Sequence, residues 1–316
     1  MNEDQRAGQI AAVAELVRER YVFPELADQI VAALDGSGER YAGLDDQAFA
    51  AAVTAELQGA NQDRHLRLMH RIDPVAEGVE PFDPEHYRAE AEHHAYGLAR
   101  VERLAGNVGV LEVRQLFDPE VAGAAVAGAF TLLAHTDALI LDLRRAPGGS
   151  PGQVALICTY LLDDMTHLNT IHNRLDGAAT PFWTLPWVPG QRYGGVKPVW
   201  VLTSATTFSG AEELAYNLQS LERATLIGET TRGGAHPTGW HRISAHLQAT
   251  IPHARSVNPV TGTNWEGVGV VPDIACAAPD AFDRAYKLAL EHVLTLGDSG
   301  LRRTTAADAT AALAAL

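Results

Sequence analysis

The second half of the chain alternates short apolar runs with helical patterns, and this alternation limits the possible folds more than any other feature. Leu-, Ile- and Val-rich runs occur in ALILDLR (138–144), PVWVLTS (198–204) and ATLIGET (224–230). Such runs are typical of strands that are buried on both faces. Helical patterns lie between and around them, over 121–136, 151–162, 209–221 and 280–296. Strands that alternate with helices through short connections predict an α/β layer structure.

The N-terminal part has a different pattern. Apolar residues at helical spacing predict three short helices before residue 61, which would form a small bundle. We therefore predict four parts along the chain. They are a helical N-terminal domain (1–73), a linker (74–98), an α/β core (99–300) and an Ala-rich tail (301–316) that is either a frayed helix or disordered.

Charge and composition exclude several classes of partner. The chain has 39 acidic and 24 basic residues, a formal charge of −15, which argues against a nucleic acid or an anionic membrane as the main partner. It has no apolar run long enough to span a bilayer and no basic start followed by an apolar segment, so we expect a cytoplasmic protein. No CxxC or HxxxH spacing occurs, and we expect no metal and no cofactor. The oligomeric state does not follow from the sequence.

A glycine turn follows the first buried run. In LILDLRRAPGGSPGQ, Gly148 and Gly149 lie between a strand and a helix, so that their amides can point into a cleft. Amides beside a helix N-terminus can bind an oxyanion. Taken alone, an ordinary strand-to-helix turn is the simpler interpretation.

A serine opens the helix after the second run. In VLTSATTFSGAEELAYNLQ, Ser209 and Gly210 lie where helix amides are free, which favours a nucleophile and its oxyanion. Serine is also a favoured helix cap, and Glu212 completes a capping box. Helix physics alone favours the cap. Ser204, Thr206 and Thr207 are alternative hydroxyls.

A serine nucleophile needs a base, and thirteen histidines leave that choice open. His65 lies where the helical region meets an extended segment, and His236 lies in the glycine-rich loop GETTRGGAH. Glu266, in TGTNWEGVGVVPD, can orient an imidazole or simply occupy a surface turn.

The order and spacing of these segments resemble the tail-specific (C-terminal processing) serine peptidase family. The resemblance is to the branch with the interphotoreceptor retinoid-binding protein modules and the tricorn protease core. It implies a ClpP/crotonase-like core of stacked ββα units. It also implies Ser209 as nucleophile, His65 as general base and Glu266 as the acid of the relay. The oxyanion hole would be Gly210 with Gly148 or Gly149.

Several positions depart from the family pattern. The Ser–Lys dyad of the bacterial branch is excluded, because the only lysines are Lys197 and Lys287 and neither lies near its position. Arg64 replaces the serine that links acid to histidine in the tricorn core, and Ala146 replaces an asparagine of the glycine-turn motif. Residues 74–98 are too few to hold a PDZ domain.

We therefore expect a serine hydrolase, and specifically a peptidase, that forms an acyl-enzyme on Ser209. Arg144, Arg232 and His236 are candidate substrate-binding residues. Two alternatives stay open. One is a retinoid-binding-like module that holds an apolar small molecule without catalysis, with the five tryptophans as pocket candidates. The other is an esterase or acyl-transfer enzyme of a specialised pathway.

Overall fold

The computed structural model describes residues 3–34, 36, 38–77 and 83–316. Its contacts divide the chain into two compact units. The first comprises the described residues of 1–82 with 170–180 and 234–257, and the second comprises 83–169, 181–233 and 258–316. The contacts thus group two segments of the predicted α/β core, 170–180 and 234–257, with the N-terminal residues. Within the described ranges, no helix has the length and apolarity that a membrane crossing requires.

The first unit packs helices against a small sheet. Its elements are α1 (Glu3–Arg20), α2 (Pro24–Ala32), η1 (Glu39–Tyr41), α3 (Asp46–Asn61), β1 (Arg67–His70), β9 (Thr238–Ser244), β10 (Leu247–Pro252) and β11 (Ala254–Val257). The three helices occur where the apolar spacing predicts them. Asp45 caps α3 by accepting a hydrogen bond of 2.8 Å from the amide of Ala48.

The small sheet is antiparallel, in the order β1-β10-β9. In its register Leu68 lies opposite Ala249, and both are buried in the same core as the helices. The N-terminal unit is therefore α/β rather than a helical bundle alone, because strands from much later in the chain complete its core.

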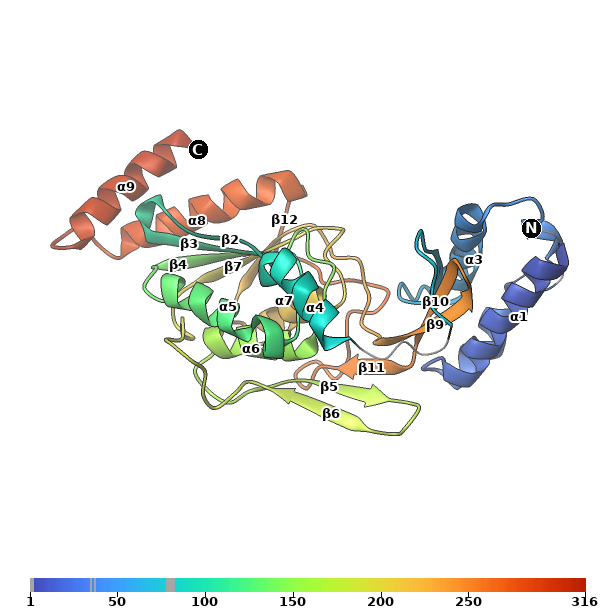
Figure 1. The fold of residues 1–316 in the computed structure, drawn as a ribbon. Helices are drawn as coiled ribbons and strands as arrows, with labels where there is room; N and C mark the ends of the chain where they lie inside the picture. Colours follow the sequence, from blue (N-terminus) through green and yellow to red (C-terminus); the bar gives the residue numbers. More distant parts are fainter. Residues whose placement is uncertain (1–2, 35, 37, 78–82) are drawn as a thin grey trace. The chain divides into compact units, whose positions relative to one another are not determined.

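The second unit is a six-stranded sheet in the order β12-β8-β7-β4-β3-β2, with β2 antiparallel and the others parallel. The strands are β2 (Leu98–Leu104), β3 (Val108–Val113), β4 (Ala138–Asp142), β7 (Val199–Thr203), β8 (Thr225–Gly228) and β12 (Ile274–Ala275). The long helices are α5 (Pro119–Leu133), α6 (Pro151–Leu161), α7 (Gly210–Ser220), α8 (Ala281–Thr295) and α9 (Arg302–Ala315). Helix α8 lies on one face of the sheet, and α5 and α6 lie on the other (Figure 1).

The α/β class predicted from the alternating runs is confirmed. Strands β3, β4 and β7 are buried along their whole length, as their apolar composition predicts. Covering both faces with helices removes these strands from water, and the parallel order brings the carboxyl ends of β4 and β7 to the same edge of the sheet.

Three regions differ from the sequence expectation. The predicted linker contains α4 (Pro84–His93), which Asp83 caps, and η2 (Ala95–Gly97). The strands β5 (His167–Asn173) and β6 (Ala179–Trp183) form in a region where the sequence pattern predicts no strand. The Ala-rich tail is the helix α9, whose Ala309 is buried in a cluster with Leu290 and Val293 of α8. Small side chains allow this close approach, which helix propensity alone does not predict. Single-turn η3 (Ala105–Asn107) and η4 (Ala278–Asp280) complete the unit.

Candidate active site

Ser209 lies on a strained turn between β7 and α7. Its backbone has φ 53° and ψ −124°, a conformation that residues with a side chain rarely adopt. Such a residue costs about 1–3 kcal/mol and persists only where its surroundings hold it in place. An ordinary helix cap has extended backbone angles. Ser209 and Glu212 form the predicted capping box, but the strained backbone of Ser209 is a feature that an ordinary cap does not need.

The carboxylate of Glu212 holds this turn. Its Oε2 accepts a hydrogen bond of 2.8 Å from the backbone amide of Ser209. Its Oε1 accepts from the hydroxyl of Thr231 at 2.5 Å and from the amide of Gly233 at 2.6 Å. The Glu212 side chain is completely buried. The sequence indicates the capping contact to Ser209, but the link to the loop after β8 needs the tertiary fold.

The glycine turn packs directly against the serine turn. A Cβ at Gly148, whose φ is +108°, would lie 2.7 Å from the Gly210 nitrogen and 2.8 Å from the Ser209 Cβ. A Cβ at Gly149 would lie 2.1 Å from the carbonyl oxygen of Leu116. Only glycine fits both positions, so the two glycines are required by close packing as well as by their backbone angles.

The amides at this junction are available to a ligand. In the part of the chain that the structure describes, the backbone N–H groups of Gly148, Gly149 and Gly210 donate no hydrogen bond. Free amides that lie close to a nucleophile can hold the negative oxygen of a tetrahedral intermediate. The structure thus brings together the predicted nucleophile and the predicted oxyanion donors.

The competing hydroxyls are engaged elsewhere. The Ser204 and Thr206 hydroxyls donate to the carbonyl oxygen of Arg144, at 2.5 and 2.8 Å, and Thr207 donates to Leu143 at 2.9 Å. These bonds fasten the loop before Ser209 to the end of β4. The three hydroxyls therefore position the site instead of supplying the nucleophile.

Glu266 belongs to the same unit as Ser209. The preceding residue, Trp265, is buried, and its ring centroid lies 5.3 Å from that of Tyr216 on α7. The amide of Glu266 donates to Asn264 Oδ1 at 2.9 Å, which shapes the turn, and the side chain is half-buried. The packing of Trp265 on α7 places this acid on a loop that is anchored to the nucleophile's helix.

Both candidate histidines belong to the first unit, where one carboxylate connects them. Asp63 Oδ1 accepts from the amide of His65 at 3.0 Å, and Asp63 Oδ2 lies 2.9 Å from His236 Nδ1. The hydroxyl of Tyr21 also donates to Asp63, at 3.1 Å, and both imidazoles are buried. Asp63 was not among the predicted site residues, although it stands two positions before His65. With a carboxylate at Nδ1, Nε2 of His236 is the basic nitrogen.

The candidate arginine Arg144 already has partners. Its guanidinium binds both oxygens of Asp142, at 3.0 and 2.7 Å, and donates to the carbonyl of Ala278 at 2.8 Å. This bidentate pair raises the pKa of Arg144. A substrate carboxylate would have to displace Asp142. Arg232, the other candidate, lies in the loop after β8 and is exposed.

A second buried glutamate follows Glu212 on α7. Burial raises the pKa of Glu213 to about 7, and the nearby amides of Asn169 and Asn217 act in the opposite direction. The side chain is only 3% exposed. Because the folded state binds this proton more tightly than the unfolded chain, the contribution of Glu213 to stability is full below its ordinary pKa of 4.5 and is lost as the pH rises to about 7.

We expect Glu213→Gln to remove this loss of stability at higher pH, because glutamine carries no titratable group. Above pH 7 the variant should have a free energy of unfolding about 3 kcal/mol higher than wild type, and at pH 4 the two should be nearly equal. Urea unfolding between pH 4 and 8 measures the difference. Glu291→Gln, on the exposed side of α8, is the matched control and should follow wild type. A difference that does not change with pH would contradict the assignment.

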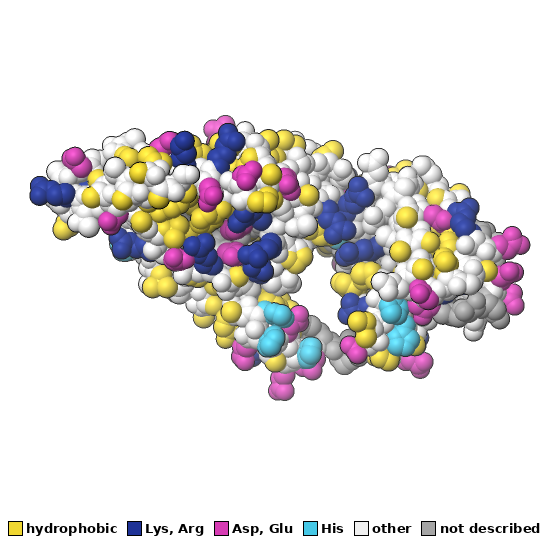
Figure 2. Space-filling model, turned by 90° about the horizontal axis from the view of Figure 1, so that it is seen from above, with side chains coloured by type: hydrophobic (Ala, Val, Ile, Leu, Met, Phe, Trp, Pro, Cys, Tyr) yellow, Lys and Arg dark blue, Asp and Glu magenta, His cyan; other side chains and the backbone are white. Residues whose placement is uncertain are grey.

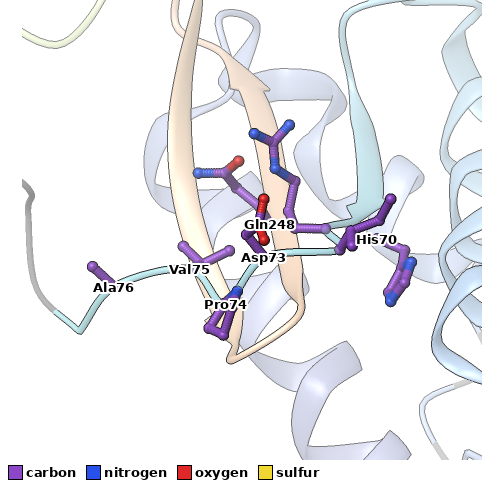
Figure 3. A pocket seen from close by; sticks show the side chains of 8 residues that line it. His70, Asp73, Pro74, Val75, Ala76 and Gln248 are labelled. Atoms are coloured by element: carbon purple, nitrogen blue, oxygen red, sulfur yellow. The ribbon is translucent and has the colours of Figure 1, made fainter. Parts of the chain in front are cut away.

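The structure also contains a hollow away from these residues. It has a volume of about 420 Å³, lies in the first unit beside the end of β1, and is lined by residues such as His70, Asp73, Val75 and Gln248 (Figure 3). No predicted site residue lines it. Of the five tryptophans, Trp200 and Trp265 are buried, whereas Trp183, Trp187 and Trp240 are exposed.

A serine on a strained strand-to-helix turn, with free amides packed against it, is the arrangement of a serine hydrolase. Residues 107–276 match the family model for Peptidase family S41. The chain belongs to this family, and by family and fold it is a serine-type peptidase of the tail-specific kind.

Solved structures share the fold. An S41 protease from Bacteroides fragilis NCTC 9343 aligns with a TM-score of 0.61 and 15% identity, over 96% of each chain. The photosystem II D1 C-terminal processing protease aligns with a TM-score of 0.51 and 15% identity, over 86% of this chain and 93% of that one. The tricorn protease aligns with a TM-score of 0.56 and 15% identity, over 92% of this chain and 37% of that one. Identities this low show similarity of fold alone.

Proposed function

We propose that this peptidase cleaves peptide bonds through an acyl-enzyme on Ser209, with His65 as general base. The observation that carries the proposal is the packing of Gly148 and Gly149 against the strained Ser209–Gly210 turn, where the amides are free. This geometry supplies hydrogen-bond donors for the oxyanion of a tetrahedral intermediate, which a helix cap does not require. A single oxyanion donor typically supplies about 3 kcal/mol of transition-state stabilisation.

The steps follow from the chemistry of the groups. The Ser209 oxygen attacks the scissile carbonyl carbon while the base takes the hydroxyl proton. The C–N bond then breaks, and the leaving amine takes that proton. Water, deprotonated by the same base, adds to the ester and releases the acyl group, which restores Ser209. Gly210, with Gly148 or Gly149, would hold the oxyanion in both halves of the reaction.

The base is proposed from residue chemistry and from the family resemblance. Asp63 binds the backbone amide of His65 and the ring of His236, so this carboxylate orients the His236 imidazole and fixes the backbone from which His65 extends. His65 is the first candidate, with Glu266 as the acid of the relay, and His236 is the second. The ClpP/crotonase-like description of the core and a cytoplasmic location also remain proposals. Two of the tryptophans are buried and three are exposed, and none of these observations favours a retinoid-binding-like module.

Labelling with a fluorophosphonate tests the proposal. Wild type should gain one adduct by intact mass, and Ser209→Ala should gain none. His65→Ala should react at least about 100-fold more slowly, the effect of removing a general base. His172→Ala, an exposed histidine of the first unit, should react like wild type.

If His236→Ala loses labelling and His65→Ala does not, His236 is the base. A folded wild type without any adduct would refute an activated serine. Peptide and ester libraries would then separate peptidase from esterase activity.

A further inference from the structure

We infer that Arg232 is a specificity-determining residue that binds a carboxylate of the substrate beside the scissile bond. The inference rests on the proposed function, since it assumes that Ser209 is the nucleophile. It adds a substrate class, which is peptides with a negative carboxylate near the cleaved bond. The argument uses only residues of the second unit.

The backbone of Arg232 is fixed to the nucleophile's turn. Its amide donates to the carbonyl oxygen of Thr207 at 3.1 Å. The residues on either side, Thr231 and Gly233, both donate to Glu212, which also accepts from Ser209. The loop that carries Arg232 is therefore hydrogen-bonded to the turn that carries Ser209.

The side chain is held beside the nucleophile as well. The guanidinium carbon of Arg232 lies 4.7 Å from the ring centroid of Phe208, the residue that precedes Ser209. Phe208 is only 5% exposed, whereas Arg232 is exposed, so the cation covers a buried ring and keeps an open side. Stacking on an aromatic face orients the planar guanidinium while leaving its N–H groups free to bind.

Arg232 differs from the neighbouring arginines because its charge is not neutralised. Arg144 is paired with Asp142, and Arg145 is paired with Glu112 at 2.6 Å. Among the residues that the structure describes, Arg232 forms no ion pair with a carboxylate. Basic and acidic side chains are interspersed on the face seen in Figure 2. In a chain with an excess of acids, an oriented and unpaired arginine beside the nucleophile is available for an anionic ligand.

The geometry of a guanidinium selects its ligand. Two parallel N–H groups match the two oxygens of a carboxylate, and charged hydrogen bonds of this kind are stronger than those between neutral groups. A peptide offers such a group in two places, the C-terminal carboxylate and the side chains of Asp and Glu. Both sources share one chemistry, and an experiment with separate arms distinguishes them.

The test uses one fluorogenic peptide mixture, randomised at the cleaved positions and made in four forms. These carry a C-terminal acid or amide, and Glu or Gln in the flanking positions. We expect wild type to prefer the acid form, or the Glu form, by about tenfold in kcat/KM. Arg232→Gln should reduce this preference to less than about twofold, and Arg232→Lys should retain part of it. Arg284→Gln, an exposed arginine of α8, should keep the full preference.

Fluorophosphonate labelling separates this inference from the proposed function, because the probe carries no carboxylate. Arg232→Gln should still gain one adduct, and the control Arg284→Gln should be labelled at the wild-type rate. If wild type is labelled but hydrolyses the four forms equally, or if Arg232→Gln keeps the full preference, the role of Arg232 is overturned and the nucleophile stands. If wild type is not labelled, the proposed function itself fails.

Discussion

Ser209→Gly should abolish acylation and, at the same time, stabilise the protein. The hydroxyl is lost, so neither fluorophosphonate labelling nor hydrolysis should be detectable. The backbone angles of φ 53° and ψ −124° are costly for serine but open to glycine. Relief of this strain should raise the free energy of unfolding by about 1 kcal/mol. Ser209→Ala should lose labelling equally and gain no stability, because alanine keeps the Cβ that causes the strain.

Urea unfolding of wild type and the two variants at one pH measures this effect. Ser150→Gly is the matched control, because Ser150 has φ −65° and glycine there should destabilise the protein. If Ser209→Gly is less stable than Ser209→Ala, strain at the nucleophile is the wrong explanation. The comparison thereby tests whether the fold stores conformational energy at the residue that performs the chemistry.

Glu212→Ala should have the largest effect on stability, a loss of about 3 kcal/mol or more. The substitution leaves two backbone amides and one hydroxyl, those of Ser209, Gly233 and Thr231, without their buried acceptor. Glu212→Gln should lower the free energy of unfolding by less, because the amide oxygen of the glutamine still accepts hydrogen bonds. In Glu212→Gln we also expect labelling of Ser209 to slow by about tenfold or more, since the turn loses an anchor.

The neighbouring residue supplies the control for this prediction. Glu212 and Glu213 are both buried acids on α7, yet Glu213→Gln should stabilise the protein at pH 8 while Glu212→Gln destabilises it. The sign differs because Glu212 accepts three strong hydrogen bonds as a carboxylate, whereas burial disfavours the charged form of Glu213. Equal effects of the two substitutions would contradict the distinct roles assigned to them.

Local sequence pattern predicted the regular elements of the second unit well. The apolar runs at 138–144 and 198–204 are β4 and β7, and the helix expected from Ser209 is α7. Local pattern failed to predict elements that are held in place by segments distant in the sequence. The strands β5 and β6 lie in polar, aromatic segments, and α9 is held by Ala309 packing on another helix. A short window of sequence does not contain those contacts.

The candidate active site shows the same division between what the sequence predicts and what depends on the tertiary fold. Sequence by itself determined which chemistry is possible. The order of the glycine turn, the serine turn and the GETTRGGAH loop resembles the tail-specific serine peptidases, and the scarcity of lysine excludes a Ser–Lys dyad. Tertiary structure decided which groups act on one another. In the fold, the Ser204 hydroxyl donates to the carbonyl oxygen of Arg144, and Asp63 binds the ring of His236. Arg232 stacks on Phe208 and forms no ion pair among the described residues. The physical reason is that composition and spacing set what a side chain can donate or accept, whereas strain, burial and pairing arise only when distant segments pack together.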